Sequence, residues 1–260
     1  MSEIKTPPSG GVLCYIVAMS IVLIDKPKGI SSFDVIRVLQ RRCREQGVLR
    51  KKEGKIKLQP PKMGHSGTLD PRASGLMIIA TGKDTKQLAT LLGLPKIYTA
   101  HIILGKHTAS GDLEAPVTEE QSAQHVTTEE VEKVLQNMHG DIELSVPLYS
   151  AIKKDGKSLY AYARKGIEVE VPKKIMHIIS AHLTTVDRSD EKHPVLEVEF
   201  HVKSGTYIRS LAEELGKRLG NIAVLKDLRR TSIGEYRVDT AISAEEVPLE
   251  GLLDIPILNS

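Results

Sequence analysis

The sequence predicts one α+β domain. Segments with strand and helix patterns are mixed along its 260 residues without the strict alternation of a doubly wound parallel sheet. No internal repeat is present, and no low-complexity linker divides the chain. With 40% hydrophobic and 27% charged residues, the chain has the composition of a globular protein that can bury a sizeable core.

The first half of the chain predicts three strands and two helices. IVLIDKP (21–27) predicts an opening strand, and Ser31 with Ser32 provides an N-cap for a helix over 33–44 that has apolar residues at helical spacing. A long loop follows, which includes a basic stretch and QPPKM. The other elements of this half are a buried strand at 76–80, a short helix over 84–93 that ends at Gly93, and a strand at 97–105.

The second half predicts two helices with two strands between them. Thr127 and Glu130 form a capping-box pattern at the start of a helix that we expect to stop at Gly140. The other elements are strands at 173–186 and 195–202, which flank a polar turn, and an amphipathic helix over 206–220.

The N-terminal region allows more than one interpretation. The apolar run at 11–24 is too short to span a bilayer and lacks a basic leader, so we expect one or two buried strands, with a signal peptide as the weaker alternative. We interpret residues 1–20 as an extension, within which Met19 could be the natural start. Cys14 and Cys43 have no metal-ligand spacing, which favours a reduced, cytoplasmic compartment.

Positive charge is concentrated in one stretch. Residues 41–57 contain eight basic and two acidic side chains, a local balance of +6 in a chain whose net charge is +3. Such a stretch suits the phosphate backbone of a nucleic acid, although a solvated loop explains it equally well.

The stretch KMGHSGTLDPRASGL (62–76) places a histidine and a carboxylate among residues small enough to let a ligand approach. It is not a nucleophile elbow, because Thr68 replaces the last glycine of G-x-S-x-G. TGKD (81–84) is not a phosphate loop, because Asp84 stands where Ser or Thr should hold the metal. Asp70 is a candidate nucleophile or general base, although an Asp-Pro turn by itself is more often structural.

Two later segments strengthen this candidate site. VKSGTYIRSLAEELG (202–216) presents Tyr207 and Arg209 near the first turn of a helix, where Arg209 could pair with Asp70 and hold it ionised. Residues 146–172 interleave tyrosines with basic residues, a mixture that suits RNA, with ordinary helix packing as an equal alternative.

Together these segments resemble the TruB-type pseudouridine synthases, which isomerise a uridine in the T loop of tRNA, at position 55 in tRNA numbering. The resemblance covers roughly residues 21–237 and follows the expected order through LIDKPKGISSFD, GHSGTLDPRASGLMIIATGKDTK, YTAHIILGKHT, VPLYSAIKKDGKSLYAYARKGI, VKSGTYIRSLAEELG and LRRTSIGEY. It implies a mixed, largely antiparallel central sheet with flanking helices. The target base is expected to flip out of the RNA stack, and no metal, nucleotide or redox cofactor is implied.

The resemblance also implies roles for individual residues. Asp70 corresponds to the essential aspartate, Arg209 pairs with it, and Tyr98 stacks on the target base. The other implied substrate-binding residues are Lys26, His65, Tyr207 and Leu228. The expected RNA-backbone contacts are Arg41, Arg42, Arg50, Lys51, Lys52, Lys153, Lys157 and Arg164. Whether Asp70 adds to the sugar or removes a ribose proton stays open.

We expect residues 21–240 to form the catalytic domain, with a basic insertion at about 41–62, and residues 241–260 to form a short tail without the RNA-binding PUA domain of many relatives. The expected protein is a cytoplasmic monomer that binds the T arm of tRNA, with no membrane association and no obligatory protein partner. The alternatives are a guide-RNA-dependent synthase related to dyskerin, a synthase for another RNA, and a catalytically silent tRNA-binding module.

Overall fold

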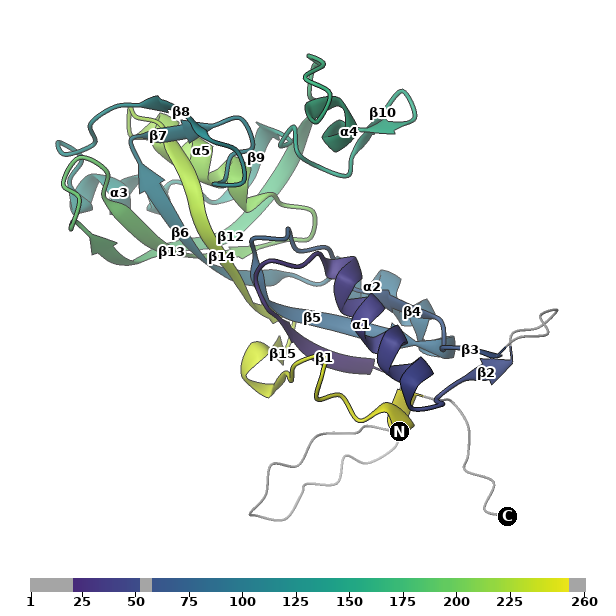
Figure 1. Cartoon of the computed structure of the whole chain (residues 1–260). Coiled ribbons are helices and arrows are strands. Elements are labelled where there is room, and N and C mark those ends of the chain that lie inside the picture. Colours follow the sequence, from purple (N-terminus) through teal and green to yellow (C-terminus); the bar gives the residue numbers. More distant parts are fainter. Residues whose placement is uncertain (1–20, 52–57, 253–260) are drawn as a thin grey trace, which may run out of the picture.

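The computed structural model describes residues 21–51 and 58–252. The expected extension with Met19, and Lys52 of the basic insertion, lie outside these residues. Within them, one curved sheet runs the length of the molecule and helices pack on its two faces (Figure 1).

In the described part of the chain, the central sheet has nine strands. Seven lie in the order β1-β5-β14-β6-β13-β12-β9, while β4 pairs with β5 and β15 pairs with β14. Their bounds are β1 Ile21–Lys26, β4 Met63–His65, β5 Ser74–Thr81, β6 Lys96–Leu104, β9 Gly140–Ser145, β12 Lys173–Asp187, β13 Val195–Val202, β14 Ala223–Ile233 and β15 Tyr236–Arg237. Neighbouring strands are antiparallel except β5 and β14, which are parallel. The predicted α+β class with a mixed, largely antiparallel sheet is confirmed.

Short two-stranded hairpins lie outside the central sheet. They are β2 Arg50–Lys51 with β3 Leu58–Gln59, β7 Lys106–Thr108 with β8 Val117–Glu120, and β10 Lys153–Lys154 with β11 Lys157–Ser158. Residues 146–172, which contain β10, β11 and a short helix, project beyond the β9 end of the sheet (Figure 1). We call these residues the α4 module.

The helices cover the two faces of the sheet unequally. Their bounds are α1 Ser32–Glu45, α2 Leu88–Gly93, α3 Thr128–Gln136, α4 Leu159–Ala163 and α5 Ile208–Arg218. Met77 and Ile79 of β5 share the main core with α1, α3 and α5, whereas Leu76 and Ile78 pack with Leu91 of α2 on the opposite face. Because both faces of β5 are covered, all eight of its residues are buried, which explains its continuous apolar run.

Both predicted N-caps are confirmed. The Asp34 N–H donates to the Ser31 hydroxyl at 3.2 Å, and the Ser31 N–H donates back to the Asp34 carboxylate at 3.0 Å. Thr127 and Glu130 form the same reciprocal box at the start of α3. These caps satisfy N–H groups that a helix leaves unpaired at its first turn.

Two predicted helix extents differ from the structure. α3 ends at Gln136, so the expected stop at Gly140 is wrong; Gly140 instead uses a φ of 79° to enter β9. The predicted helix over 84–93 begins with a 3₁₀ helix at Gly82–Gln87, and only α2 is α-helical, although its end at Gly93 is as predicted.

Strand β14, which lies in the middle of the sheet, is not predicted by the sequence pattern. Its sequence AVLKDLRRTSI contains four charged residues, and these hide the apolar alternation of a strand. One of them, Arg230, is only 1% exposed inside the sheet. A buried arginine of this kind is stable because backbone carbonyls accept its hydrogen bonds.

The expected boundary at residue 240 falls inside packed structure. The Asp25 N–H donates to the Ile242 carbonyl at 2.9 Å, and the Ile242 N–H donates to the Leu23 carbonyl at 3.1 Å, so this segment covers the edge of β1. Its apolar side chains Ala244, Val247, Leu249 and Leu252 are buried in the main core. Residues 241–252 therefore belong to the same domain as the sheet. Within 21–51 and 58–252, no helix is long and apolar enough to cross a membrane.

Candidate active site

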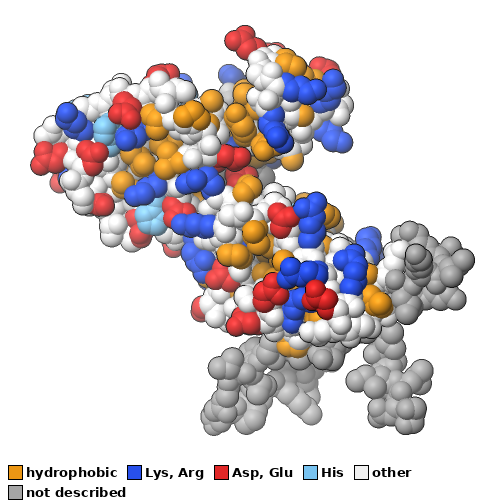
Figure 2. Space-filling view, in the orientation of Figure 1, with side chains coloured by type: hydrophobic (Ala, Val, Ile, Leu, Met, Phe, Trp, Pro, Cys, Tyr) orange, Lys and Arg blue, Asp and Glu red, His pale blue; other side chains and the backbone are white. Residues whose placement is uncertain are grey.

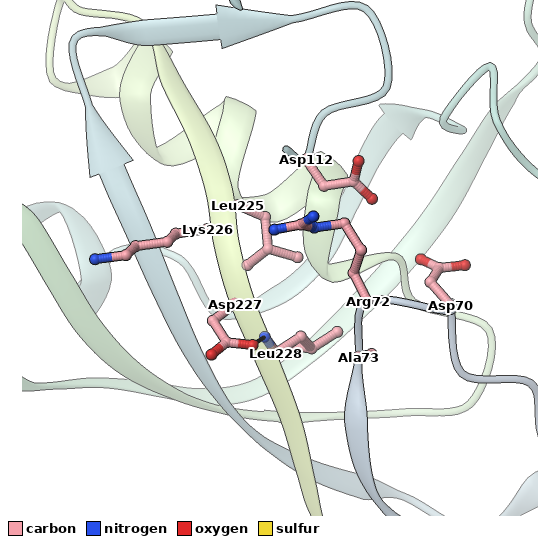
Figure 3. A pocket seen from close by; sticks show the side chains of 8 residues that line it. All are labelled: Asp70, Arg72, Ala73, Asp112, Leu225, Lys226, Asp227 and Leu228. Atoms are coloured by element: carbon pink, nitrogen blue, oxygen red, sulfur yellow. Dashed lines mark hydrogen bonds between the residues drawn. The ribbon is translucent and has the colours of Figure 1, made fainter. Parts of the chain in front are cut away.

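The loop between β4 and β5 carries Asp70 on a tight turn. The Ala73 N–H donates to the Asp70 carbonyl at 3.0 Å, and Pro71, whose ring fixes its φ, lies at the second position of the turn. The side chains of Asp70 and Arg72 line the same pocket from this one turn (Figure 3).

The start of α1 holds the loop on one side. The Leu69 N–H donates to the Ser32 hydroxyl at 2.7 Å, and that hydroxyl donates to the Leu69 carbonyl at 2.9 Å. The Gly29 N–H also donates to the Pro71 carbonyl at 2.8 Å. The residues on both sides of Asp70 are therefore tied to the segment that links β1 to α1.

Strand β14 holds the loop on the other side. Arg230 donates from Nε to the Leu76 carbonyl at 2.7 Å and from Nη2 to the Gly67 carbonyl at 3.1 Å. The backbone of Arg230 also lies opposite Gly75 in the parallel pair of β14 with β5. One buried residue thus contacts both ends of the Asp70 loop.

Arg209 approaches Asp70 from α5. Its Nη2 lies 3.0 Å from Asp70 Oδ2, and its side chain is 5% exposed. The same guanidinium donates at 2.8 Å to the carbonyls of Ser110 and Tyr149. The expected ion pair is therefore present, and two backbone carbonyls also accept hydrogen bonds from the arginine.

A second carboxylate, Asp112, lies beside this pair. Its Oδ2 is 3.8 Å from Arg209 Nε, and its Oδ1 accepts hydrogen bonds from the Ser110 hydroxyl at 2.7 Å and the Glu114 N–H at 2.9 Å. Sequence reasoning missed Asp112. The available signal was Ser-Gly-Asp at 110–112, a small-residue turn with a carboxylate that resembles the surroundings of Asp70.

Burial raises the pKa of the Asp70 carboxyl above its ordinary value of 3.8. Arg209 opposes this rise most strongly and Lys26 more weakly, while the negative charge of Asp112 adds to it. Arg209 thus favours the ionised form of Asp70, as expected, while burial more than offsets the effect of this ion pair on the pKa.

The carboxylates of Asp70 and Asp112 line a small pocket. It is lined by Asp70, Arg72, Ala73, Asp112, Leu225, Lys226, Asp227 and Leu228 (Figure 3). Leu225 and Leu228 are buried, so β14 provides an apolar wall beside the charged groups. A carboxylate with a raised pKa beside an apolar wall is a typical arrangement for acid, base or nucleophilic chemistry.

The sequence matches the family described as "TruB family pseudouridylate synthase (N terminal domain)" over residues 54–208. It is 40% identical over 236 residues to a protein named tRNA pseudouridine synthase B from Chlorobium luteolum, covering 91% of this chain and 76% of the relative. A protein of the same name from Parabacteroides distasonis is 38% identical over 231 residues, covering 89% and 92%.

The chain belongs to the TruB family of pseudouridylate synthases. This TruB chain is therefore an isomerase.

Solved structures share the fold of this TruB chain. A chain of an H/ACA RNP bound to a substrate RNA containing 2'-deoxyuridine aligns with a TM-score of 0.60 and 22% identity over 90% of this chain. A chain of an archaeal box H/ACA sRNP complex aligns with a TM-score of 0.57 and 22% identity over 92%. In each case the match spans 54% of the other chain, about half its length.

The other expected substrate-binding residues of the TruB chain differ in how close they lie to Asp70. Leu228 lines the pocket, and Tyr207, the N-cap of α5, has a pKa raised by burial and by the nearby charge of Asp70. Tyr98 is 8% exposed on β6, opposite Arg230. His65 lies on β4, where burial and the charge of Arg230 lower the pKa of its ring. Neither Tyr98 nor His65 lines the pocket of Figure 3.

Lys26 lies behind the Asp70 turn, inside the TruB fold. It is fully buried, and its Nζ donates to the carbonyls of Pro27 and Ile30 at 2.8 Å and to that of Pro71 at 3.5 Å. Burial lowers the pKa of Lys26 to about 8. Its contacts are thus with the backbone that carries Asp70.

The expected RNA-backbone residues fall into distinct groups. Lys153, Lys157 and Arg164 are exposed on the α4 module of the TruB chain. Arg41 is exposed on α1 and pairs with Glu245 at 2.9 Å. Arg42 does not fit the expectation, because its Nη1 donates to the carbonyls of Ala244 and Val247 and its side chain is largely buried. Arg50 and Lys51 form β2, and Lys52 lies outside the described residues.

Proposed function

We propose that this chain is a tRNA pseudouridine synthase that converts the T-loop uridine of tRNA to pseudouridine. The observation that carries this proposal is the Asp70–Arg209 ion pair at an open pocket in a TruB-family fold. The names of its bacterial relatives support tRNA as the substrate.

The reaction breaks the bond between C1′ of the ribose and N1 of uracil and rejoins the two through C5 of the base. We propose that Asp70 acts in its ionised form, either by adding to the sugar or by removing a ribose proton, and that Arg209 stabilises this ionised form. Because the base must leave the RNA stack to reach Asp70, the pocket receives a flipped nucleotide.

The remaining residues support this step. Tyr98 stacks on the flipped base, Tyr207 and Leu228 line its pocket, and His65 contacts neighbouring nucleotides. Lys26 is a positioning residue, because its hydrogen bonds go to the backbone of the Asp70 turn.

The phosphate backbone of the tRNA lies along two basic regions. These are the α4 module, with Lys153, Lys157 and Arg164, and the face of α1 that carries Arg41. In Figure 2, Lys and Arg side chains gather over the α4 module and over α1, and the surface between these regions is hollowed. A T arm bound in this hollow would bring its loop toward Asp70.

The enzyme acts on tRNA as a monomer in the cytoplasm, without an obligatory protein partner. The structural neighbours are chains of ribonucleoprotein complexes. The number of protein copies that bind one tRNA is therefore the quantity that tests the monomer. Sedimentation with and without tRNA distinguishes a single protein copy per tRNA from a larger assembly.

The deciding experiment compares the wild-type protein with Asp70→Asn on an unmodified tRNA transcript. Pseudouridine is mapped by a chemical adduct that stops reverse transcription. We expect one stop in the T loop, lost in Asp70→Asn, while tRNA affinity stays within about threefold because the substitution keeps the side-chain shape.

Asp239→Asn is the matched control, since Asp239 is an exposed aspartate on the 3₁₀ helix Val238–Thr240. It should leave the stop unchanged. Near-normal turnover by Asp70→Asn would contradict the role of Asp70. Tight tRNA binding without any pseudouridine in the wild type would contradict the proposed function as a whole.

A further inference from the structure

Arg72 stands out among the charged groups of the pocket. It is exposed, it lines the pocket, and it makes no hydrogen bond or ion pair with any residue in 21–51 and 58–252. The acidic groups that line the pocket are all engaged. Asp70 and Asp112 contact Arg209, and Asp227 pairs with Lys28.

The turn geometry determines where Arg72 lies relative to Asp70. Asp70 is the first residue of the turn and Arg72 the third, and the hydrogen bond from Ala73 to Asp70 closes it. In Figure 3 the Arg72 side chain extends from the loop toward Asp112, whereas Lys226 points in another direction. The contacts that fix the backbone of the Asp70 turn therefore also fix the backbone of Arg72 at the edge of the pocket.

Arg72 is not among the charged residues that shift the pKa of Asp70. The charges that act on the Asp70 carboxyl are those of Arg209, Asp112 and Lys26. Its side chain is exposed and has no ion pair among the described residues, so its five donors remain available for a ligand that brings an acceptor to the pocket.

The chemistry of the substrate supplies that acceptor. A uridine inside an RNA chain carries a phosphodiester on each side of its ribose, and flipping the base into the pocket leaves these phosphates at the opening. A planar guanidinium matches two phosphate oxygens with parallel hydrogen bonds, which an ammonium group does not do.

We propose that Arg72 binds a phosphodiester adjacent to the flipped uridine and so anchors the target nucleotide over Asp70. This inference rests on the proposed function and adds to it a substrate-binding residue. Because Arg72 contacts the phosphate and not the reacting atoms, its loss should weaken RNA binding more than it slows the chemical step.

The test combines a protein variant with a substrate of altered charge. Affinity and single-turnover rate are measured for wild type and Arg72→Ala on a T-arm RNA hairpin, and on the same hairpin with a neutral methylphosphonate at the linkage before or after the target uridine. We expect Arg72→Ala to weaken binding of the unmodified hairpin about tenfold, as for loss of one charge-assisted contact. The slope of log affinity against log salt should fall by the amount expected for the loss of about one phosphate contact.

The proposal is decided by whether the losses of affinity caused by Arg72→Ala and by the methylphosphonate are additive. If Arg72 holds one of these phosphates, the corresponding methylphosphonate weakens binding to wild type but not further to Arg72→Ala. Arg72→Lys should recover only part of the affinity, because lysine keeps the charge without the planar fork. Full additivity at both linkages would overturn the inference.

The control is Arg237→Ala, which removes the same charge from an exposed position on β15 away from the pocket. It should bind all hairpins like wild type. Because binding is read separately from turnover, absence of pseudouridine in the wild type would count against the proposed function, whereas additive binding would count against Arg72 alone.

Discussion

At the scale of single residues, the state of Asp70 results from two opposed effects. Burial among the loop, β14 and α5 disfavours its charge, while Arg209 at 3.0 Å favours it. The net direction is upward, so the carboxyl is a stronger base than an exposed aspartate. The raised pKa therefore suits a residue that must take a proton or attack a sugar from its ionised form.

The pH dependence of the reaction tests this balance. Since the ionised carboxylate is the active form and its pKa is raised, the single-turnover rate should increase with pH through a pKa above 3.8. Arg209→Gln removes the largest opposing charge, so the acidic limb should move to still higher pH. Single-turnover pseudouridine formation between about pH 3 and pH 8 measures the acidic limb of each of the two proteins.

Arg218→Gln is the control for this experiment, because Arg218 lies on the same helix and pairs with Glu214. Its acidic limb should coincide with that of wild type. An acidic limb whose pKa is at or below 3.8 in the wild type, or whose pKa does not change in Arg209→Gln, would show that Asp70 is not the titrating group.

At the scale of elements, the Asp70 loop depends on the close approach of β5 and β14. Gly75 has a φ of 106°, and a Cβ added there would lie 2.2 Å from the Arg230 carbonyl oxygen. The parallel pairing of these two strands at this point therefore requires glycine. Only four residues separate Gly75 from Asp70, so the strand contact also sets the position of the carboxylate.

Gly75→Ala should therefore destabilise the fold by more than about 2 kcal/mol, because both the clash and the backbone conformation are unfavourable. Urea denaturation followed by circular dichroism measures this loss. Gly93→Ala is the control, since a Cβ there meets no atom within 4 Å and its φ is not positive. It should change stability by less than about 0.5 kcal/mol. Equal stability of the two variants would exclude a packing role for Gly75.

At the scale of the whole molecule, positive charge is spread over both sides of the hollow. The α4 module contributes exposed lysines and one exposed arginine, Arg164, which also lies 5.9 Å from the ring centroid of Tyr160. Two of its apolar side chains, Val146 and Leu159, are buried, whereas Tyr160 and Ile167 are exposed. Its surface is thus suited to an extended polyanion and not to a small ligand.

Replacing Lys153, Lys157 and Arg164 together by alanine should weaken tRNA binding and make it less sensitive to salt. Each lost phosphate contact lowers the slope of log affinity against log salt by roughly 0.7 to 0.9, so a fall of about 2 is expected for the three. The control removes the exposed charges of Lys133, Lys192 and Lys217, which lie outside the α4 module. A slope that falls equally in both variants would indicate general charge attraction without a specific path.

Much of this fold was predictable because its signals are local. Caps at Ser31 and Thr127, the apolar run of β5 and the alternation of β6, β12 and β13 depend on neighbouring residues in sequence. β14 was not predictable in this way, since Arg230 and Ser232 are buried through contacts with distant segments. The end of α3 was misplaced because Gly140 serves the turn into β9.

The sequence by itself determined the fold class, the family motifs and the candidates Asp70 and Arg209, because motifs are patterns local in sequence; the roles of these two residues are implied by the resemblance that the motifs carry. Only the tertiary structure placed Asp112 and Arg72 at the same pocket and assigned Arg42 to an internal role. It also showed that the Asp70 pKa is raised. The physical reason is that hydration and charge interactions depend on distances across the fold, which separate segments acquire only when they pack together.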